Sequence, residues 1–497
     1  MKLRDLIKNV KIKEIIGNLN IDIEGVYHDS RGIEKDNLFV CIKGFSEDGH
    51  HFINHSIKNG ATALIVEKKV KPIDGVTIIR VKNSRQALAQ IANQFYKYPS
   101  QQLKLIGVTG TNGKTTITYM LKCILEGAGY KAGLLGTAEN IVGDQVNSSR
   151  MTTMESIDLQ KTLREMVNQD NDYVVMEVSS HALELYRVEG CDFETAIFTN
   201  ISREHFELHK NFDNYIKAKK KLFIRLNKSN KNPKNKFAVI NLDEEYSNEF
   251  LAVNKTNLIT YGIREKEADV SAKNIHLDLE KLSFIAKTPK GEIMVHLKTS
   301  GRYNIYNALA AIAVAVTQNI PLELISKSLN NFHGAPGRYK ILKYGQKFTV
   351  IIDFAHNYHG LGNILQNLRL FAKKRIITIF GHGGGKYHQV RAIIGEVLGR
   401  FSDYIVITAD NPKNEDPLNI AREIEVGIKK YTCNYKIILD RKKAINYALE
   451  IAEEDDIVLI AGKGPETEQI YHQEVIHHND EEVVYKKLLG SQKIESF

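Results

Sequence analysis

A glycine-rich turn between an apolar segment and an amphipathic segment constrains the fold of this chain most strongly. The segment LKLIGVTGTNGKTTITYML, residues 103–121, reads as a buried strand ending at Val108, a turn, and a helix that starts near Lys114. The commonest phosphate-binding loop would place its first glycine at position 108, where this chain has valine. Glycines stand at 107 and 110 instead. The pattern therefore predicts a less common form of phosphate-binding loop within a parallel α/β sheet.

The residues of this turn suit an anion. Gly110 and Gly113 let backbone N–H groups converge, and the helix N-terminus adds its positive dipole end. Lys114 would supply charge to the β- and γ-phosphates of a nucleotide, and the Thr115 hydroxyl would bind Mg²⁺. The alternative is an ordinary strand–helix turn, which the Gly-Lys-Thr-Thr sequence disfavours. The predicted nucleotide-binding residues here are Gly110, Thr111, Asn112, Gly113, Lys114, Thr115 and Thr116.

The pattern of apolar runs and polar turns changes along the chain, and this change predicts three α/β domains. Residues 1–100 alternate short apolar runs with polar turns, and 98–102 is a plausible linker. Residues 101–332 repeat strand–loop–helix units, including apolar runs at 172–180 and 195–202. Residues 333–497 contain four further apolar runs that break into Gly, His, Asp or Asn, which is typical of a second doubly wound, Rossmann-like sheet.

The composition narrows the class of protein. The chain has 497 residues, 26% of them charged, and a formal net charge of +9. Four widely spaced cysteines without a Cys-x-x-Cys pair give no support to a zinc ribbon, and a reduced cytoplasmic enzyme is the expectation. The longest apolar run, 308–316, is too short to cross a bilayer, so no membrane insertion is expected.

The positive charge leaves nucleic acid, an acidic membrane surface or a polyanionic small substrate as possible partners. The densest basic stretch is 217–236, and we interpret its part 224–236 as a solvated surface loop. A nucleic-acid-coupled ATPase is the rival of a different class. It is disfavoured because no strip of interleaved aromatic and basic residues is present for base stacking.

Polar side chains follow two further predicted strands. Glu177 ends the run at 173–177, where a carboxylate at a strand tip can hold Mg²⁺ directly or through water. His205 follows the run at 195–202. A lone histidine is more often structural than a metal ligand, and hard Mg²⁺ prefers oxygen.

Several motifs occur together in one order and carry a resemblance to a known family. They are GVTGTNGKTT, MEVSSHALELYRV, FTNISREHF, NYIKAKKKLF, GRYNIYNALAA, PGR and DFAHN. In this order they closely resemble the Mur ligases of peptidoglycan precursor synthesis. The segment 29–67 is similar to the branch of that family that adds the third residue of the stem peptide. The resemblance covers nearly the whole chain, and the turn at 110–116 matches the form of the loop that the family uses.

The resemblance implies an ATP-dependent ligase that forms an amide bond through an acyl phosphate, in the cytoplasm and as a monomer. ATP and two Mg²⁺ ions are the implied cofactors, with Thr115, Glu177, His205 and Lys219 as metal-binding positions. Lys219 matches a lysine that members of the family carbamylate, which would turn a cation into an anionic oxygen ligand. Lys114, Lys219, His205 and Asp353 match the catalytic group, and Asn307, Arg338, His356 and Asn357 match positions that contact ATP.

The implied partners are UDP-MurNAc-L-Ala-D-Glu and a free amino acid, with no nucleic acid. The UDP-linked substrate is implied to lie between the first two domains. The matching positions for it are Ser30, Arg31, Thr152, Thr153, Glu155, Ser156, Ser179 and Arg187.

The incoming amino acid, meso-diaminopimelate or L-lysine, is left open by the sequence. Its matching positions are Lys386, Asp410, Asn411, Lys413, Gly462 and Glu466. Lys413 stands where diaminopimelate ligases carry an arginine, so it keeps the positive charge but loses the bidentate fork. The segment 383–392, GGGKYHQVRA, departs further from the family pattern. A paralogue that adds an unusual amino acid, a binding protein on a ligase scaffold and a sister ligase for another substrate are the alternatives.

Overall fold

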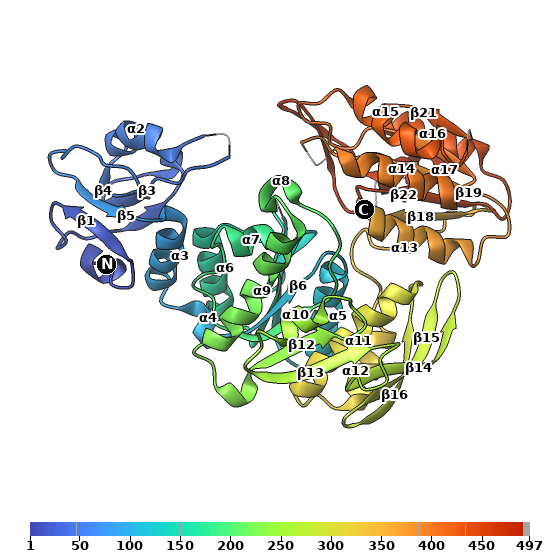
Figure 1. Cartoon of the computed structure of the whole chain (residues 1–497), viewed down its shortest axis with the longest axis horizontal. Coiled ribbons are helices and arrows are strands. Elements are labelled where there is room, and N and C mark those ends of the chain that lie inside the picture. The colour runs from blue at the N-terminus through green and yellow to red at the C-terminus, as the bar shows by residue number, and fades with distance from the viewer. Residues whose placement is uncertain (46, 150, 386–387, 433, 491–497) are drawn as a thin grey trace.

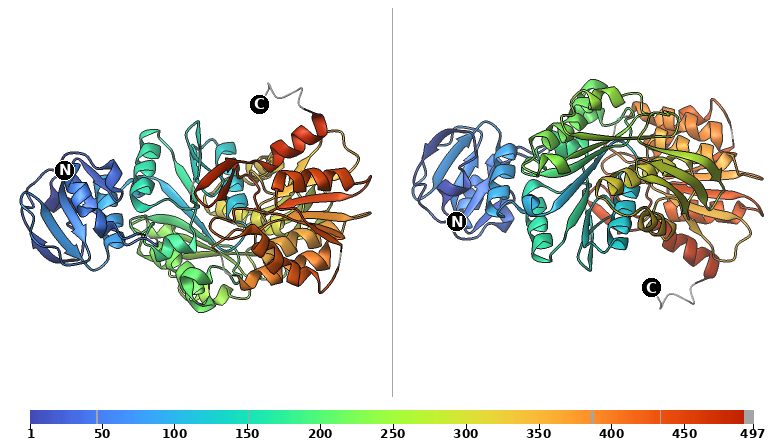
Figure 2. Two further views of the ribbon diagram at one scale, coloured as in Figure 1. Left: turned by 90° about the horizontal axis from the view of Figure 1, so that it is seen from above. Right: turned by 90° about the horizontal axis from the view of Figure 1, so that it is seen from below.

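The computed structural model describes residues 1–45, 47–149, 151–385, 388–432 and 434–490. Three helix-covered sheets lie in a row, with the central one between the N-terminal and C-terminal ones (Figure 1). The two views of Figure 2 show the same order from above and below. The α/β fold class predicted from the sequence is confirmed.

The N-terminal sheet has five strands in the order β1-β5-β4-β3-β2, and β1 is antiparallel to its neighbour. Two of the short apolar runs noted in the sequence form β3 and β4, and α3 follows β5. The bounds are β1 (Ile12–Ile16), β2 (Gly25–Tyr27), β3 (Asn37–Val40), β4 (Ala61–Val66), β5 (Thr77–Val81), α1 (Leu3–Leu6), α2 (Ile53–Lys58) and α3 (Ser84–Phe95).

The central sheet has eleven strands in the order β16-β15-β14-β13-β12-β11-β6-β10-β7-β8-β9. Its middle strands are parallel, and antiparallel strands extend both edges. The strands are β6 (Lys104–Thr109), β7 (Ala132–Leu135), β8 (Glu139–Val142), β9 (Gln145–Ser148), β10 (Tyr173–Glu177), β11 (Phe193–Phe198), β12 (Phe237–Asn241), β13 (Asn257–Gly262), β14 (Val270–Leu277), β15 (Leu282–Thr288) and β16 (Gly291–Leu297).

Helices cover both faces of the central sheet and bury one apolar cluster on each. One cluster contains α5 (Lys114–Gly127), α11 (Arg302–Thr317) and α12 (Leu322–Asn330), and the other contains α6 (Ser156–Asn168) and α9 (Phe212–Lys228). The apolar run 308–316 lies inside α11 and is buried, which explains why that helix is hydrophobic on all sides. Shorter helices complete the layer: α4 (Pro99–Gln102), α7 (Ser180–Glu184), α8 (Phe206–His209) and α10 (Ser247–Leu251).

The C-terminal sheet has six strands in the order β17-β18-β22-β19-β20-β21, all parallel except the edge strand β17. The four apolar runs noted in the sequence form β18, β19, β20 and β22. The bounds are β17 (Lys340–Leu342), β18 (Thr349–Asp353), β19 (Ile376–Phe380), β20 (Tyr404–Ile407), β21 (Tyr435–Ile437), β22 (Ile457–Ala461), α13 (Tyr358–Arg369), α14 (Gln389–Phe401), α15 (Pro417–Ile428), α16 (Arg441–Ile451) and α17 (Asp480–Leu489), with a hairpin of β23 (Glu468–Tyr471) and β24 (Glu474–His477).

One local expectation needs correction. The stretch 224–236 is not wholly a surface loop, because α9 continues to Lys228 and buries Leu226. Lys236 is buried there, and its ammonium donates to Asn227 O and Ser229 O at 3.1 Å each. The expected linker 98–102 contains the short helix α4. Among the described residues, no helix is both long enough and apolar enough to cross a membrane.

Candidate active site

The glycine-rich turn joins β6 to α5, as the sequence predicts, and β6 lies among the middle strands of the central sheet. Gly110 and Gly113 have φ angles of +150° and +90°, which side chains rarely adopt. A Cβ on Gly110 would lie 1.8 Å from Thr199 Oγ1. The Lys114 ammonium donates to Gly110 O at 2.9 Å and Thr111 O at 2.7 Å, so it lies folded over the turn. Burial lowers the pKa of Lys114.

The tip of the neighbouring strand β10 contacts the start of α5. Thr115 Oγ1 donates to Glu177 Oε1 at 2.9 Å, and Arg338 Nη2 donates to Thr115 Oγ1 at 3.0 Å. The Glu177 carboxylate also accepts from Thr137 N at 2.8 Å and Thr137 Oγ1 at 3.0 Å. A hydroxyl and a buried carboxylate thus face one another at the end of two parallel strands. This oxygen pair has the chemistry that Mg²⁺ prefers.

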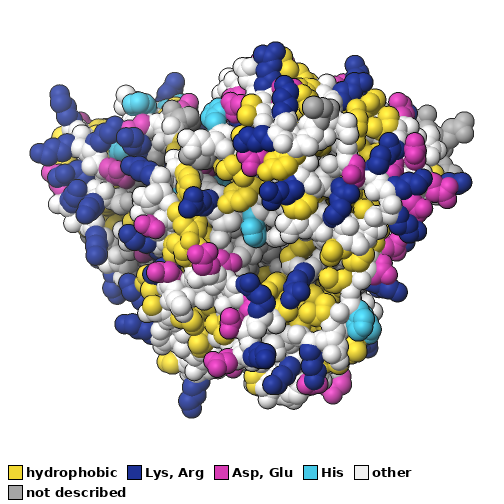
Figure 3. All heavy atoms as spheres, turned by 45° about the vertical axis from the view of Figure 1, so that its right-hand side comes forward, with side chains coloured by type: hydrophobic (Ala, Val, Ile, Leu, Met, Phe, Trp, Pro, Cys, Tyr) yellow, Lys and Arg dark blue, Asp and Glu magenta, His cyan; other side chains and the backbone are white. Residues whose placement is uncertain are grey.

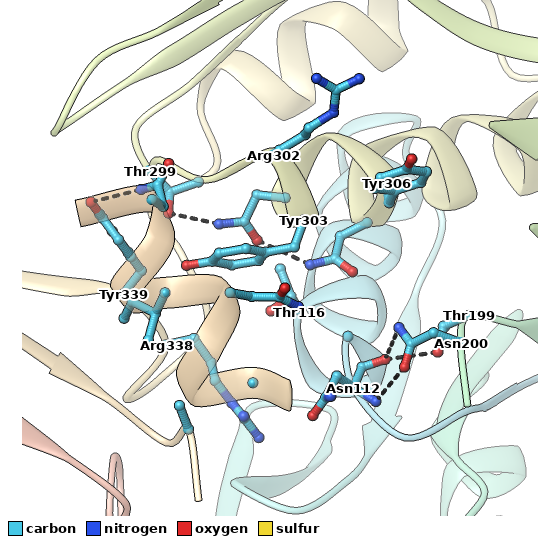
Figure 4. A pocket seen from close by; sticks show the side chains of 18 of the residues that line it. Asn112, Thr116, Thr199, Asn200, Thr299, Arg302, Tyr303, Tyr306, Arg338 and Tyr339 are labelled. Carbon is cyan, nitrogen blue, oxygen red and sulfur yellow. Dashed lines mark hydrogen bonds between the residues drawn. The ribbon is translucent and has the colours of Figure 1, made fainter. Parts of the chain in front are cut away.

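A cavity of about 570 Å³ lies beside the turn, between the central and C-terminal sheets (Figure 4). Thr116 and Asn307 line it from the central side, and Arg338 and Asp353 from the C-terminal side. Asp353 accepts from Tyr339 N and Ala355 N at 2.7 Å each, and burial raises its pKa. The volume is that of a small-molecule site, and its mixed lining of apolar and polar side chains fits a nucleoside.

Two buried polar atoms at this cavity have no hydrogen-bond partner among the described residues: Tyr303 Oη and Arg338 Nε. Such groups are costly unless a ligand satisfies them. Sequence reasoning missed Tyr303 and its neighbour Tyr306, whose phenol donates to Asp243 Oδ2 at 2.6 Å. The only signal for either was its position beside Asn307 in the motif GRYNIYNALAA.

The domains also meet through amides. Asn357 Nδ2 donates to Asn112 Oδ1 at 3.0 Å, which joins the start of α13 to the phosphate-binding turn. Asn357 also caps α13 by accepting from Gly360 N at 2.7 Å. His356 lies nearby, where its ring packs against Phe354 with centroids 4.9 Å apart. The DFAHN motif therefore reaches the turn through Asn357.

Lys219 lies beside the turn, and His205 lies in a neighbouring histidine cluster that meets Lys219 at the Tyr215 ring. The buried Lys219 ammonium donates to Gly110 O at 2.7 Å and sits 4.5 Å from the Tyr215 ring. Burial, followed by the charge of Lys114, lowers the pKa of Lys219 well below its usual value. His205 contacts Glu207 at 3.1 Å and packs against His181, with ligand atoms of all three within 4.8 Å of one another. A hydrogen bond thus joins Thr115 to Glu177, whereas His205 bonds to Glu207.

The positions predicted for the UDP-linked substrate lie along the first two domains. Thr153 Oγ1 donates to Glu177 O at 2.9 Å, and Ser179 N donates to Thr153 Oγ1 at 3.1 Å. Glu155 pairs with Arg187 at 2.7 Å. Thr152 Oγ1 accepts from Thr137 Oγ1 at 3.1 Å, and Ser156 is buried at the start of α6.

In the N-terminal domain, the two predicted residues differ in their surroundings. Ser30 is buried, and its carbonyl accepts from Asn59 Nδ2 at 3.1 Å. The Arg31 side chain is 84% exposed and pairs with Asp29 at 2.6 Å. Arg31 is thus held at the surface by its own neighbour.

The predicted amino-acid positions gather at the carboxyl ends of β20 and β22. Asn411 Nδ2 donates to Glu466 Oε2 at 3.0 Å, and Gly462 has a φ of +111° beside Asp410. A residue that sequence reasoning missed ties these groups together. Lys463 is fully buried, with its ammonium 2.8 Å from Glu466 Oε2, 3.2 Å from Asn411 Oδ1 and 3.6 Å from Asp410 Oδ1.

Two further positions were expected in this region. Lys413 has an exposed side chain and a φ of +54°, and its backbone pairs with Ile470 O and His472 N. Lys386 lies outside the described residues. Close to it in sequence, Arg391 is buried and pairs with Glu415 and Glu423 at 2.9 Å each. The guanidinium of Arg391 therefore serves the packing of α14 against α15.

The positive charge of the chain is dispersed on the face drawn in Figure 3. Lysine and arginine side chains there alternate with acidic and apolar ones. A nucleic-acid footprint would gather them along one stripe.

A phosphate-binding turn, a carboxylate at the neighbouring strand tip and a nucleoside-sized cavity closed by a further α/β domain define a nucleotide-dependent enzyme of three domains. Family models match the chain in the same three parts: the Mur ligase family catalytic domain over 22–96, the Mur ligase middle domain over 108–315 and the Mur ligase glutamate ligase domain over 337–464. The chain belongs to the Mur ligase family.

Individual relatives extend along the whole chain. It is 45% identical, over 97% of its length and 98% of that protein, to the UDP-N-acetylmuramoyl-L-alanyl-D-glutamate--2,6-diaminopimelate ligase of Alkaliphilus oremlandii. It is 43% identical, over 99% of its length and 100% of that protein, to the ligase of the same name from Caldanaerobacter subterraneus. A solved structure of a ligase of this name superposes with a TM-score of 0.67 at 26% identity, covering 98% of both chains.

Proposed function

We propose that this chain is a MurE-type ligase that uses ATP to join meso-diaminopimelate to UDP-MurNAc-L-Ala-D-Glu in peptidoglycan precursor synthesis. The observation that carries the proposal is the contact between Thr115, at the phosphate-binding turn, and both Glu177 and Arg338. It links the ATP-binding part of the central domain to the C-terminal domain at the place where a phosphoryl group would transfer. Relatives named for this reaction match along nearly the full chain.

Amide formation from a carboxylate needs activation because the carboxylate charge is delocalised and makes the carbon a poor electrophile. The free carboxylate of the dipeptide attacks the γ-phosphorus of ATP, and ADP leaves. The amine of the incoming amino acid then attacks the acyl phosphate, and inorganic phosphate departs. The residues contribute by positioning and by charge neutralisation, which dominate phosphoryl transfer.

Each side chain at the turn has a role in that scheme. Lys114 exchanges its bonds to Gly110 O and Thr111 O for phosphate oxygens, and Arg338 adds a second positive charge. Thr115 and Glu177 would hold one Mg²⁺, which neutralises charge on the phosphates when bound. Asn307 and Asp353 line the nucleoside cavity, as do Asn112, Gly113 and Thr116.

A second Mg²⁺ would be held by His205 and by Lys219 after carbamylation. The supporting observation is the burial of Lys219, since its lowered pKa favours the neutral amine that reacts with CO₂. The test is intact-protein mass spectrometry with ¹³C-bicarbonate trapping, comparing the wild type with Lys219→Arg. A label that appears equally in both proteins contradicts carbamylation at this position.

The three domains divide the work. We propose that residues 1–100 bind the UDP moiety, residues 101–332 bind ATP, and residues 333–497 bind the amino acid. The buried group of Lys463, Asn411 and Glu466 supports the last assignment. A cation at Lys413, exposed and free to reach a ligand, favours a substrate with a distal carboxylate over L-lysine, whose terminal ammonium it would repel.

The deciding experiment supplies purified protein with ATP, Mg²⁺ and UDP-MurNAc-L-Ala-D-Glu. It compares phosphate release and product mass with meso-diaminopimelate, L-lysine and L-ornithine. We expect turnover with meso-diaminopimelate, its loss in Lys114→Ala and its retention in Lys122→Ala, which changes a lysine elsewhere on the same helix. Failure of oxygen-18 to pass from the dipeptide carboxylate into phosphate would contradict the acyl phosphate.

We also propose that the protein acts in the cytoplasm, because Cys41, Cys123 and Cys191 are unpaired, and as a monomer, because the cavity is lined by one chain. Light scattering after size-exclusion chromatography should give one chain mass, near 56.3 kDa. A dimer mass that persists on dilution contradicts the monomer.

A further inference from the structure

Arg85 reaches from the N-terminal domain to Glu155 of the central domain. It lies on α3, and its Nη1 is 3.6 Å from Glu155 Oε2. Glu155 Oε1 is in turn 2.7 Å from Arg187 Nη2. One carboxylate at the start of α6 is therefore shared by two guanidiniums from different domains.

This cluster is enclosed and carries an excess of positive charge. The side chains of Arg85, Glu155 and Arg187 are 17%, 13% and 13% exposed. Glu67 is a more distant acid, and its Oε1 is occupied by Ser84 N and Ser84 Oγ at the start of α3. Burial, together with the charge of Arg187, lowers the pKa of Arg85. A further anion would reduce the electrostatic repulsion between these two guanidiniums.

The donors of the cluster are incompletely used. Arg187 Nη1 donates to Thr153 O at 3.1 Å, but its Nε is buried without an acceptor among the described residues. The best acceptor for Arg85 other than Glu155 is Lys43 O, at 3.5 Å, which is the limit of a hydrogen bond. Lys43 belongs to the rim of a cavity of about 330 Å³ in the N-terminal domain. The cluster thus stands between that cavity and Thr153.

We propose that Arg85, together with Arg187, forms an anion-binding site for the UDP-linked substrate at the boundary of the N-terminal and central domains. Glu155 bridges the two guanidiniums and orients them, and the substrate anion completes the charge balance. Guanidinium groups bind phosphate and carboxylate oxygens through paired donors, so either the diphosphate or a carboxylate of the sugar-peptide fits. The inference rests on the proposed function because it names a residue for that same substrate.

Arg164 in the same interface shows what an arginine with a purely structural role looks like, and Arg85 differs from it. Arg164, on α6, donates to Tyr96 O at 2.9 Å and to Lys97 O at 2.8 Å. It joins the same two domains through well-formed bonds to carbonyls. Arg85 has the longer and weaker contacts, which suits a group that exchanges them for a ligand.

The test measures binding of UDP-MurNAc-L-Ala-D-Glu, UDP and UMP by calorimetry at low and high salt, in Arg85→Gln, Arg85→Lys and Arg164→Gln. We expect Arg85→Gln to weaken binding of the full substrate by about tenfold or more and to lower its salt dependence. Arg85→Lys should recover part of the affinity. Arg164→Gln should lower the melting temperature with little effect on affinity, and the KM for ATP should stay unchanged in all three.

Comparing UDP with the full substrate shows which substrate group, the diphosphate or a carboxylate, binds to the two arginines. A loss that also appears with UDP assigns the diphosphate, and a loss confined to the full substrate assigns a sugar-peptide carboxylate. Equal effects of Arg85→Gln and Arg164→Gln, or an unchanged salt dependence in Arg85→Gln, overturn the inference. Wild-type binding without turnover overturns the proposed function alone, and absence of binding to any UDP compound overturns both.

Discussion

Replacement of the buried Lys463 by methionine should destabilise the C-terminal domain and weaken amino-acid binding. Methionine keeps most of the side-chain volume but removes the ammonium that lies between Glu466, Asn411 and Asp410. Removing one partner of a buried ion pair costs about 3–5 kcal/mol. The Glu466 side chain is 38% exposed and regains water, which places the loss near the lower limit, about 3 kcal/mol. For a domain of this size that is a fall of roughly 6–12 °C in melting temperature.

Differential scanning calorimetry checks the stability change, with Lys429→Met as the matched control. Lys429 also pairs with a glutamate, Glu425, at 3.2 Å, but its side chain is 56% exposed. Its loss should change the unfolding free energy far less, because exposed ion pairs contribute little to stability. Equal falls in melting temperature for the two variants would refute the reasoning that burial makes the Lys463 contacts strong.

Steady-state kinetics separates positioning from general damage. Lys463 holds Glu466 and Asn411, so Lys463→Met should raise the KM for the amino acid by about tenfold or more and leave the KM for ATP within about twofold. Lys463→Arg should restore part of the change. A parallel rise in both KM values would show that the residue acts through the fold as a whole.

Three further predictions address the backbone, the pH dependence and the specificity. Gly337→Ala should lower the free energy of unfolding by more than about 1 kcal/mol in urea titrations, because its φ is +61° and a Cβ would lie 2.2 Å from Pro465 N. Gly345→Ala should lower it less, because no atom lies within 4 Å of a Cβ at that position, although its φ is +91°. Burial raises the pKa of Glu244 to about 7, so at intermediate pH the folded state holds a proton that the unfolded state releases. The free energy of unfolding should therefore fall as the pH rises from about 4.5 to above 7. Glu244→Gln should flatten that fall in urea midpoints measured at pH 5 and 8, and an unchanged slope would contradict the reasoning. Lys413→Glu should raise the KM for meso-diaminopimelate and improve L-lysine relative to it, whereas equal changes for both substrates would remove Lys413 from the distal carboxylate.

The sequence could predict those parts of the site that depend on neighbours along the chain. The strand, turn and helix around Lys114 follow from apolar spacing and two glycines, and Glu177 was found because it ends an apolar run. These signals are local, so they survive without knowledge of the packing. The resemblance added Arg338, which the structure places against Thr115 although 223 positions separate them.

The residues that sequence reasoning missed depend on contacts between distant segments. Lys463 reads as one more lysine until β20 and β22 bring Asn411 beside it, and Arg85 reads as a helix surface residue until α6 meets α3. Tyr303 stands out, among the described residues, by a buried hydroxyl without a hydrogen-bond partner, which no sequence pattern signals. The prediction for the end of α9 was wrong because lysines and asparagines indicate exposure to solvent but occur in both helices and loops.

The cavity between the central and C-terminal sheets has a consequence for inhibition. Its walls include α11 on one side and α13 on the other, so its shape depends on how the two domains are oriented. A compound wedged between these helices would hold them apart and disable catalysis without imitating any substrate. A fragment of the chain cut before Arg338 would keep the lysine of the turn yet lack the opposing wall.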